Sequence, residues 1–244
     1  MNSATPFPIP TWFLSAALLM SLGQPIAAWG QAAGTLAGGP SLVIDDFSQS
    51  DGLPQRWKAW TGKSLRPLEP RDFEPHRSIS IEQGTAHLRT VNGIAHMGMA
   101  TQGDDITWAL RDLPVLSWRW KAHRVPERAS ERSSARNDVA AAVYVFFDFD
   151  WLNRPRALKY TYSSTLPVGT TVDQGSLKVI VVSSAADGLR HAWESVRVNV
   201  LEDYKRLFDR DPPAMPLMIR IWSDTDSTED ASHVEMDDLV ARAR

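Results

Sequence analysis

The stretch "RNDVAAAVYVFFDFD", residues 136–150, has the apolar character of a strand in the middle of a β-sheet. A strand with one face in water alternates apolar and polar residues, whereas this stretch is mostly apolar on both faces. One face begins with Val139 and is apolar throughout, so we expect it to enter a hydrophobic core. The other face begins with Asp138 and continues with the small residues Ala140 and Ala142. We expect a long loop or a helix to cover this second face, or the face to form the floor of a cleft that holds a ligand.

Short runs of alternating residues, separated by turn residues, fill most of the chain on both sides of this strand. In "LSWRWKAH", residues 116–123, Trp118 and Trp120 share the face that we expect to be core. One segment, near residues 201–209, has helical spacing of its apolar residues instead, and Pro212 ends it. The pattern predicts a mostly all-β fold, an antiparallel and jelly-roll-like β-sandwich with one short helix near residues 201–209.

The first 40 residues contain no Asp, Glu, Lys or Arg, and "WFLSAALLMSL" forms an apolar run of the length found in signal peptides. We expect residues 1–32 to be a signal peptide, residues 33–41 a linker, and residues 42–244 a single β-sandwich domain. The leader has no basic residue before its apolar run, so the alternatives are a disordered apolar leader and a mispredicted start codon. Export would place the protein in the periplasm of a bacterium or outside the cell. No segment of the expected mature chain is apolar enough to span a membrane.

The composition excludes several kinds of chemistry. The chain has no cysteine, which excludes disulfide bonds, thiolate nucleophiles and cysteine-ligated zinc. Its formal net charge of −3 gives no general attraction to nucleic acid. The motifs of P-loop nucleotide binding, serine hydrolases and HExxH metalloproteases are absent. The six histidines lie far apart in the sequence, and we expect them on the surface or in turns rather than around a metal ion.

Acidic residues alternate in "DTDSTEDASHVE", residues 224–235. Asp224 and Asp226 have the spacing of the first calcium ligands of an EF-hand loop, but Glu229 stands where that loop needs a glycine. The flanking residues are strand-like rather than helical, which also excludes an EF-hand. Two interpretations remain, a calcium loop of another kind with Asp224 and Asp226 as ligands, and an acidic turn in water.

Arg119 lies on the strand face opposite the two tryptophans, so its side chain should point away from the core. If its strand neighbours the one that follows Asp138, Arg119 would face this carboxylate. An arginine held by a carboxylate presents its remaining donors in a fixed orientation, which suits carboxylate, phosphate or vicinal hydroxyl groups. The predicted ligand-binding residues are Arg119, Asp138, Tyr144, Arg197 and Asn199. The alternative is a structural ion network, in which the helix covers this face and Asp203 pairs with Arg119 or Arg197.

Four short motifs occur along the chain, namely WRW at residues 118–120, NDVAAAVYVFFD at 137–148, EDYKRLF at 202–208 and DTDST at 224–228. With these motifs the chain resembles a family of exported bacterial proteins catalogued as domain of unknown function 3047, over about residues 43–239. The resemblance implies a single exported domain and supplies no established reaction. The chain departs from the family pattern at Asn137, where an acid is expected, and at Ala142, where an arginine is frequent. A site that uses these groups in relatives would be altered here.

More weakly, the chain resembles carbohydrate-binding jelly-roll domains, in which the first and last strands lie together, often near a structural calcium ion. We therefore expect the strand at residues 41–47 to pair with the strand at residues 233–242. This pairing would crowd four acids, Asp45, Asp46, Asp237 and Asp238. Like charges this close repel one another, so we expect a calcium ion or an arginine side chain between them.

These features favour an exported, ligand-binding β-sandwich that recognises carbohydrate or another polyhydroxylated molecule of the cell envelope. The main alternative is a hydrolase or lyase that acts on envelope glycans with carboxylates such as Asp138 and Asp224. A third is a protein-interaction module. A deep polar cleft with both acids would indicate the enzyme, a shallow aromatic groove the binding protein, and a flat apolar patch the interaction module.

Overall fold

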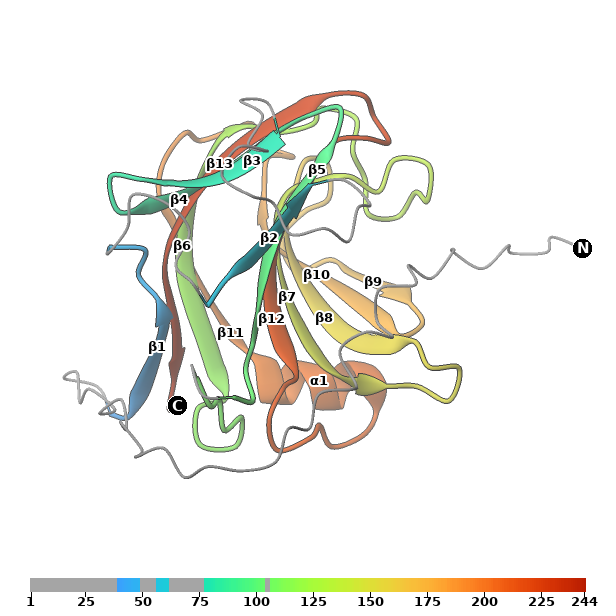
Figure 1. The fold of residues 1–244 in the computed structure, drawn as a ribbon. Coiled ribbons are helices and arrows are strands. Elements are labelled where there is room, and N and C mark those ends of the chain that lie inside the picture. The colour runs from blue at the N-terminus through green and yellow to red at the C-terminus, as the bar shows by residue number, and fades with distance from the viewer. Residues whose placement is uncertain (1–38, 49–55, 62–76, 104–105) are drawn as a thin grey trace, which may run out of the picture.

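The computed structural model describes residues 39–48, 56–61, 77–103 and 106–244, so the predicted signal peptide and most of the predicted linker lie outside the described residues. The described residues form two β-sheets that pack face to face (Figure 1). The first sheet contains β1 (Ser41–Asp45), β3 (Arg77–Glu82), β4 (Thr85–Val91), β6 (Val115–Arg124), β11 (Glu194–Asn199) and β13 (Ala231–Arg242). The second contains β2 (Lys58–Thr61), β5 (Ile94–Ala100), β7 (Val139–Phe149), β8 (Pro155–Ser163), β9 (Thr171–Gln174), β10 (Leu177–Ser184) and β12 (Met218–Asp224).

The strands of the first sheet follow the order β11-β6-β13-β4-β3, and β1 also pairs with β13. Those of the second follow the order β2-β5-β12-β7-β8-β10-β9. The strand pairings are antiparallel except for that of β8 with β10, which is parallel. The predicted mostly all-β sandwich is therefore confirmed, with one parallel pair in place of a purely antiparallel arrangement.

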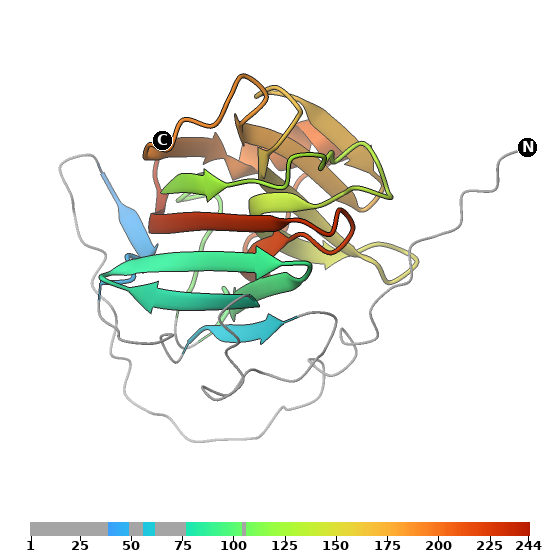
Figure 2. The ribbon, with the colours of Figure 1, turned by 90° about the horizontal axis from the view of Figure 1, so that it is seen from above.

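The last strand, β13, lies in the middle of the first sheet, between β6 and β4 (Figure 2). The part of β13 nearest the C-terminus also pairs with β1, where Val43 lies opposite Val240. The first and last strands thus lie side by side, as predicted, and β1 starts at Ser41, the last residue of the predicted linker.

Tryptophans of β6 and tyrosines of β8 join the two sheets across the core. The ring of Trp118 lies 6.0 Å from that of Tyr160, and the ring of Trp120 lies 5.6 Å from that of Tyr162, between centroids. Trp120 Nε1 also donates a hydrogen bond of 2.9 Å to Ser183 Oγ on β10. All four rings are buried, and large aromatic side chains contribute most to the energetics of such a core. The tryptophan face of β6 is core, as its alternation predicts.

β7 is central in the second sheet, between β12 and β8, as the apolar character of residues 136–150 predicts. Ala141, Val143 and Val145 enter the core between the sheets. Because side chains alternate along a strand, Ala142 and Tyr144 lie on the outer face of the second sheet, away from the first sheet.

The helix α1 (Val200–Phe208) closes one end of the core between the sheets (Figure 1). Tyr204 packs on Phe147 with ring centroids 4.5 Å apart, and Tyr160 Oη donates a hydrogen bond of 3.2 Å to Asp203. Phe147 and Tyr160 both belong to the core. The helix is where the sequence predicts it. Of the three possibilities for the Asp138 face of β7, cover by this helix is wrong, because the packing partners of the helix lie on the opposite face.

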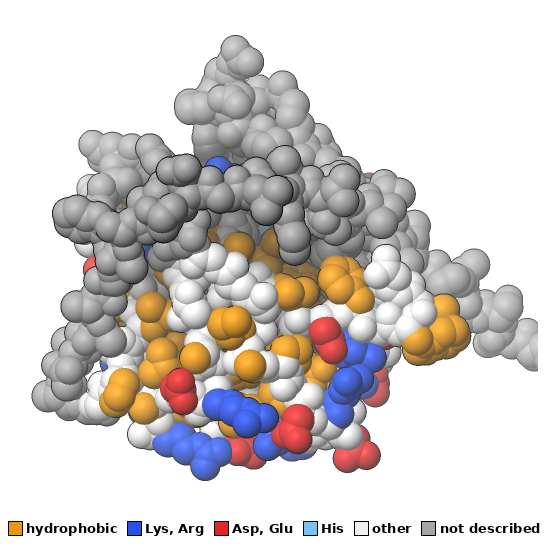
Figure 3. All heavy atoms as spheres, turned by 60° about the horizontal axis from the view of Figure 1, so that its bottom comes forward, with side chains coloured by type: hydrophobic (Ala, Val, Ile, Leu, Met, Phe, Trp, Pro, Cys, Tyr) orange, Lys and Arg blue, Asp and Glu red, His pale blue; other side chains and the backbone are white. Residues whose placement is uncertain are grey.

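The surface at this end of the molecule intermixes basic and acidic side chains (Figure 3). Two of its ion pairs join Lys205 to Asp211, at 2.9 Å, and Arg206 to Asp203, at 2.7 Å. This surface therefore lacks the single sign of charge that attracts nucleic acid. Within the described ranges, no helix has the length and apolar character needed to span a membrane.

Candidate functional site

The outer face of the second sheet carries three polar side chains in a row across three adjacent strands. Tyr144 on β7 lies in register with Arg220 on β12 and with Lys159 on β8. Lys159 Nζ lies 5.3 Å from the centre of the Tyr144 ring, and the guanidinium carbon of Arg220 lies 5.3 Å from the centre of the Phe146 ring. Two cations thus lie close to aromatic rings, at distances typical of cation–π interactions.

A second row of side chains lies next to the first. Trp222 on β12 is in register with His96 on β5 and with Ala142 on β7. The His96 and Trp222 rings stack with centroids 4.3 Å apart and planes inclined by 17°, and the Tyr144 ring lies 5.9 Å from that of Trp222. Tyr144 and Trp222 are partly exposed, so this face offers an aromatic platform that is accessible to solvent.

The two cations of this face are buried, with 5% of Lys159 and 2% of Arg220 exposed. Burial lowers the pKa of the Lys159 ammonium, but the nearby Tyr144 and Asp224 raise it, and its pKa lies above the ordinary value overall. Burial lowers the pKa of Arg220 to about 10, which is still well above neutral pH. Both side chains are therefore charged at pH 7. Because a buried charge is costly unless polar neighbours stabilise it, this face is a polar assembly and not an extension of the core.

Three acids meet at one end of this face. One ligand oxygen from each of Asp138, Asp224 and Asp226 lies within 4.8 Å of the others. The Asp138 carboxylate accepts hydrogen bonds from Ser227 N at 3.1 Å, from Thr228 N at 2.7 Å and from Thr228 Oγ1 at 2.6 Å. Asp138 therefore anchors the turn between β12 and β13 to the start of β7.

Asp224, at the end of β12, makes a second contact between the same two segments. Its carboxylate accepts a hydrogen bond of 2.8 Å from Val139 N, at the start of β7. The pKa of Asp224 is raised to about 6, because the effect of burial and of the nearby Asp138 carboxylate exceeds the opposing effect of the Lys159 charge. Carboxylate oxygens are the ligands that calcium prefers, and the structure adds Asp138 to the predicted pair Asp224 and Asp226. Since hydrogen bonds already engage both Asp138 oxygens, the geometry itself indicates a structural clasp, and calcium binding stays a prediction.

Arg119 lies on the other outer face of the sandwich, that of the first sheet. Its guanidinium pairs with Asp237 at 2.6 Å and Asp238 at 2.9 Å on β13, and it lies 4.7 Å from the centre of the Trp193 ring. Asp238 has a φ of 55° at a bulge in the pairing of β13 with β6, which lets two successive acids reach one arginine. The expected contact between Arg119 and Asp138 is wrong. Both residues face away from the core, but they belong to different sheets, whose outer faces point in opposite directions.

The remaining predicted ligand residues also separate. Arg197 on β11 is exposed on the same outer face as Arg119, on the adjacent strand. Asn199 is the N-cap of α1, and its side-chain oxygen accepts a 3.1 Å hydrogen bond from a backbone N–H of the first helical turn. Of the five predicted residues, only Tyr144, on β7, and Asp138, directly before β7, are associated with the second sheet.

Acids of the first strand and of the last strand form ion pairs with two different arginines. Asp45 pairs with Arg56 at 2.9 Å and accepts a hydrogen bond of 2.6 Å from Trp57 Nε1. The side chain of Asp46 accepts a hydrogen bond from the backbone of Ser48, while Arg119 holds the two acids of β13. In the part of the chain that the structure describes, no joint metal-ligand cluster forms from the predicted set Asp45, Asp46, Asp237 and Asp238.

The sequence alone does not reveal the roles of Lys159 and Arg220. Arg220 is a single cation among apolar residues in "LMIRIW", and Lys159 shares the strand "PRALKYTYS" with another cation, Arg156, so the local signal is weak. Their alignment with Tyr144 depends on strand register, which a short stretch of sequence does not specify. The same limit applies to His87 and His233, which are far apart in the chain but lie 3.2 Å apart, between Nδ1 and Nε2, on adjacent strands of the first sheet.

Comparison with known proteins gives a family and distant structural likenesses. The family described as "Protein of unknown function (DUF3047)" matches residues 66–240. No curated protein sequence matches the chain.

Among solved structures, the family 11 carbohydrate-binding module of a cellulosomal cellulase of Clostridium thermocellum is 9% identical, with 85% of this chain and 96% of that chain covered and a TM-score of 0.39. The family 30 carbohydrate-binding module of another cellulosomal cellulase of Clostridium thermocellum is 13% identical, with 82% and 98% covered and a TM-score of 0.41. A native family 12 xyloglucanase from Bacillus licheniformis is 10% identical, with 84% and 100% covered and a TM-score of 0.37.

Proposed function

The chain belongs to the family described as Protein of unknown function (DUF3047), and we propose that it is an exported, ligand-binding β-sandwich that recognises carbohydrate or another polyhydroxylated molecule of the bacterial cell envelope. The observation that carries the proposal is the outer face of the second sheet, where partly exposed Trp222 and Tyr144 lie beside buried Lys159 and Asp224.

The chemistry of this face suits a ligand with hydroxyl groups. The C–H faces of a sugar ring pack on aromatic rings such as Trp222 and Tyr144, which combine an apolar surface with a polar group. A hydroxyl group both donates and accepts hydrogen bonds, and the face offers an ammonium donor in Lys159 and a carboxylate in Asp224. Binding sites of this kind combine an aromatic surface with a few polar groups that fix the orientation of the ligand.

Affinity electrophoresis of the purified protein in gels that contain soluble polysaccharides tests the proposal. We expect at least one polysaccharide to retard the parent protein, and the Trp222→Ala variant to bind it about tenfold more weakly, because an aromatic contact contributes about 1.5 kcal/mol. Trp151→Ala is the matched control, since Trp151 lies in the turn between β7 and β8 and is 86% exposed. It should bind as the parent does.

Two results would count against this site. Equal retardation of the parent and Trp222→Ala would exclude the aromatic platform, and loss of binding in Trp151→Ala would move the ligand to the turn between β7 and β8. A parent protein that no polysaccharide retards would remove the proposed ligand class.

A hydrolase that acts on envelope glycans is the second candidate function, and one observation favours it. Asp224 has a pKa of about 6, as suits a general acid, and a second carboxylate, that of Asp138, lies within 4.8 Å. The hydrogen bonds that engage both Asp138 oxygens make binding the better supported function. Release of reducing ends from a retarding polysaccharide, abolished in Asp224→Asn, would establish the hydrolase instead.

Export is the other part of the proposal, and it rests on the uncharged, apolar leader at residues 1–32. We expect the protein from an extracytoplasmic fraction to start at Ala33. N-terminal sequencing measures this directly, and a cytoplasmic product that keeps Met1 would contradict it.

A further inference from the structure

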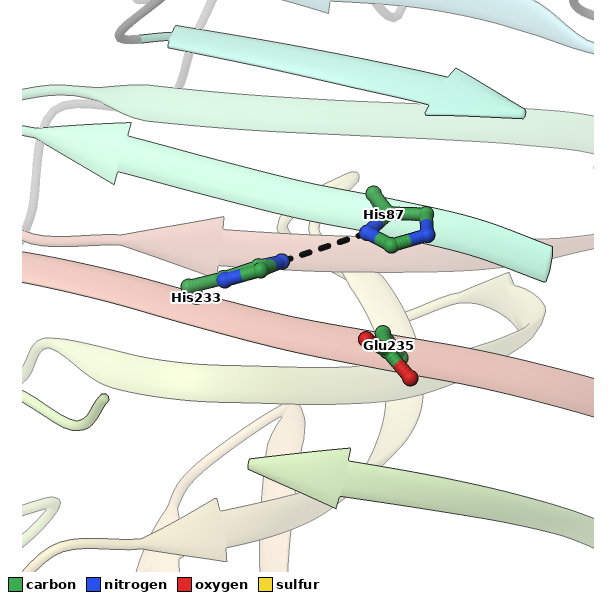
Figure 4. Close-up of side chains that lie close together, drawn as sticks. All are labelled: His87, His233 and Glu235. Carbon is green, nitrogen blue, oxygen red and sulfur yellow. Dashed lines mark hydrogen bonds between the residues drawn. The ribbon is translucent and has the colours of Figure 1, made fainter. Parts of the chain in front are cut away.

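Two histidines and a glutamate gather on the outer face of the first sheet, on adjacent strands (Figure 4). His87 on β4 lies opposite Glu235 on β13, and His233 precedes Glu235 by two residues, on the same face of β13. One ligand atom from each of the three lies within 4.8 Å of the others. From this geometry we propose that His87, His233 and Glu235 form a binding site for a divalent transition-metal ion such as zinc.

The distance between the imidazoles fits direct coordination. His87 Nδ1 and His233 Nε2 lie 3.2 Å apart, and Figure 4 shows the two rings turned toward each other. Two nitrogens bound tetrahedrally to zinc, each at about 2.0–2.1 Å, lie about 3.3 Å from one another. The observed separation therefore matches one edge of the coordination tetrahedron, and Glu235, which has a carboxylate oxygen within 4.8 Å of a nitrogen of each histidine, can supply the third ligand.

A third histidine supports the carboxylate from outside this set. His123 on the adjacent strand β6 has its Nε2 2.7 Å from Glu235 Oε1, and its ring stacks on that of His233 with centroids 4.6 Å apart. Metal ligands are characteristically oriented by such outer hydrogen bonds. We therefore assign His123 as a positioning residue for Glu235 and His233.

The protonation states also suit a metal. Burial, with the charge of Arg89 adding to it, lowers the pKa of His87, and the same two causes lower that of His233 to about 4. Burial raises the pKa of Glu235, but the hydrogen bond and charge of His123 lower it overall. At neutral pH the imidazoles are therefore neutral and the carboxylate is ionised, which are the forms that bind metals.

Arg89 is the charged group that opposes the ion. Its Nη2 lies 2.9 Å from His87 Nδ1 and donates a hydrogen bond of 3.0 Å to Glu82 Oε2. A neutral imidazole nitrogen has one lone pair, so Arg89 and a metal compete for His87. Glu82 remains as the partner of Arg89 when the metal takes its place on His87. We therefore expect removal of the Arg89 charge to increase the affinity of the site for metal.

The donor set determines the class of ion. Imidazole nitrogens suit zinc, cobalt, nickel and copper, whereas calcium and magnesium prefer oxygen ligands. Three protein ligands leave a fourth tetrahedral position for water or for a group of a bound molecule. This site lies on the opposite outer face from the proposed carbohydrate face, so it does not depend on that function.

Titration with Co²⁺, followed by its visible absorption spectrum and by displacement with Zn²⁺, tests the site on protein purified without a histidine tag. We expect one ion per chain with a tetrahedral spectrum, loss of this spectrum in His87→Ala and in His233→Ala, and an affinity about 10–100-fold lower in His123→Gln. Arg89→Gln should bind Co²⁺ more tightly than the parent.

The matched control is His191→Asn, because His191 is exposed and has a φ of 52°, which asparagine tolerates. It should leave the spectrum unchanged. Unfolding curves recorded without metal show whether each variant is folded. A folded parent that gives no tetrahedral Co²⁺ spectrum, or a folded His233→Ala that binds as His191→Asn does, would overturn the site.

Discussion

Replacement of Arg119 by methionine tests which of its contacts stabilise the fold. Methionine keeps much of the aliphatic stem but removes the guanidinium that pairs with Asp237 and Asp238 and lies over Trp193. Asp237 is buried, and its second hydrogen bond, from the backbone N–H of Asp238 at 2.8 Å, does not neutralise its charge. The variant therefore leaves a buried carboxylate without its cation.

The magnitude lies between two reference cases. Removal of one partner from a fully buried ion pair costs about 3–5 kcal/mol, whereas exposed pairs contribute about 0.2–1 kcal/mol. The Arg119 side chain is 42% exposed, so solvent screens the pair, and the more exposed Asp238 contributes little. We expect the free energy of unfolding to fall by about 1–3 kcal/mol, which for a domain of this size lowers Tm by about 2–4 °C per kcal/mol.

The pH dependence gives a sharper test than the magnitude. Burial raises the pKa of Asp237, and the bond to Arg119 offsets only part of that increase, so loss of Arg119 raises the pKa further. The destabilisation should therefore be largest at neutral pH and shrink as the pH falls and Asp237 is protonated in both proteins.

Urea unfolding followed by tryptophan fluorescence measures the difference. The double variant Arg119→Met, Asp237→Asn should recover most of the lost stability at neutral pH, because it removes the unpaired charge. An Arg119→Met protein as stable as the parent at neutral pH, or a loss of stability that is the same at all pH values, would refute the reasoning.

Three further predictions concern the acids beside β7. Asp138→Ala should lower the free energy of unfolding by about 2–4 kcal/mol in urea titrations, because three hydrogen-bond donors of the β12–β13 turn lose their acceptor. Because the pKa of Asp224 is about 6 in the folded protein and 3.8 in the reference state, its contribution to stability should fall as the pH rises from about 4 to 6, and Asp224→Asn should lack this slope. If the predicted calcium site at Asp224 and Asp226 exists, excess Ca²⁺ should raise Tm in the parent but not in Asp226→Ala.

The alternation of residues predicts the layers of this fold well. The two tryptophans of β6 and the Val139 face of β7 are core, and α1 lies where helical spacing and Pro212 place it. These features depend on the side-chain period of strands and helices, which acts over a few residues and is therefore visible in short stretches of sequence. The pairing of the terminal strands was also predictable, from the resemblance to jelly-roll domains.

The candidate site was much less predictable, for a physical reason. Alternation shows correctly that Arg119 and Asp138 point away from the core, but it does not show which sheet each strand joins. A sandwich has two outer faces, and strands that are consecutive along the chain, such as β6 and β7, belong to different sheets here. Polar residues assigned to one surface by parity can therefore lie on opposite sides of the molecule.

The same geometry explains why the histidines escape a sequence search. His87 and His233 are 146 residues apart in the chain, and only the placement of β13 between β4 and β6 brings them together with His123. The two ligands of a local motif such as His-x-x-x-His lie on one helix at a fixed spacing in the sequence. Ligands on different strands come together only through strand order and register. A cluster of this kind is consequently a property of the sheet and not of any segment.

The two outer faces differ in chemistry, and the core between them separates the two proposed sites. One buried polar cluster links strands of both sheets: Ser232 Oγ lies 2.7 Å from Thr90 Oγ1 and 2.6 Å from Ser223 Oγ. Ser232 precedes a proposed metal ligand, His233, and Ser223 follows the aromatic platform residue Trp222. Coupling between two binding sites requires a structural element with two arrangements whose populations both ligands shift. The hydroxyl groups of this cluster form short hydrogen bonds with one another within a packed core, which favours a single arrangement. We therefore expect metal and carbohydrate to bind independently, with the same polysaccharide affinity in the presence and absence of Zn²⁺.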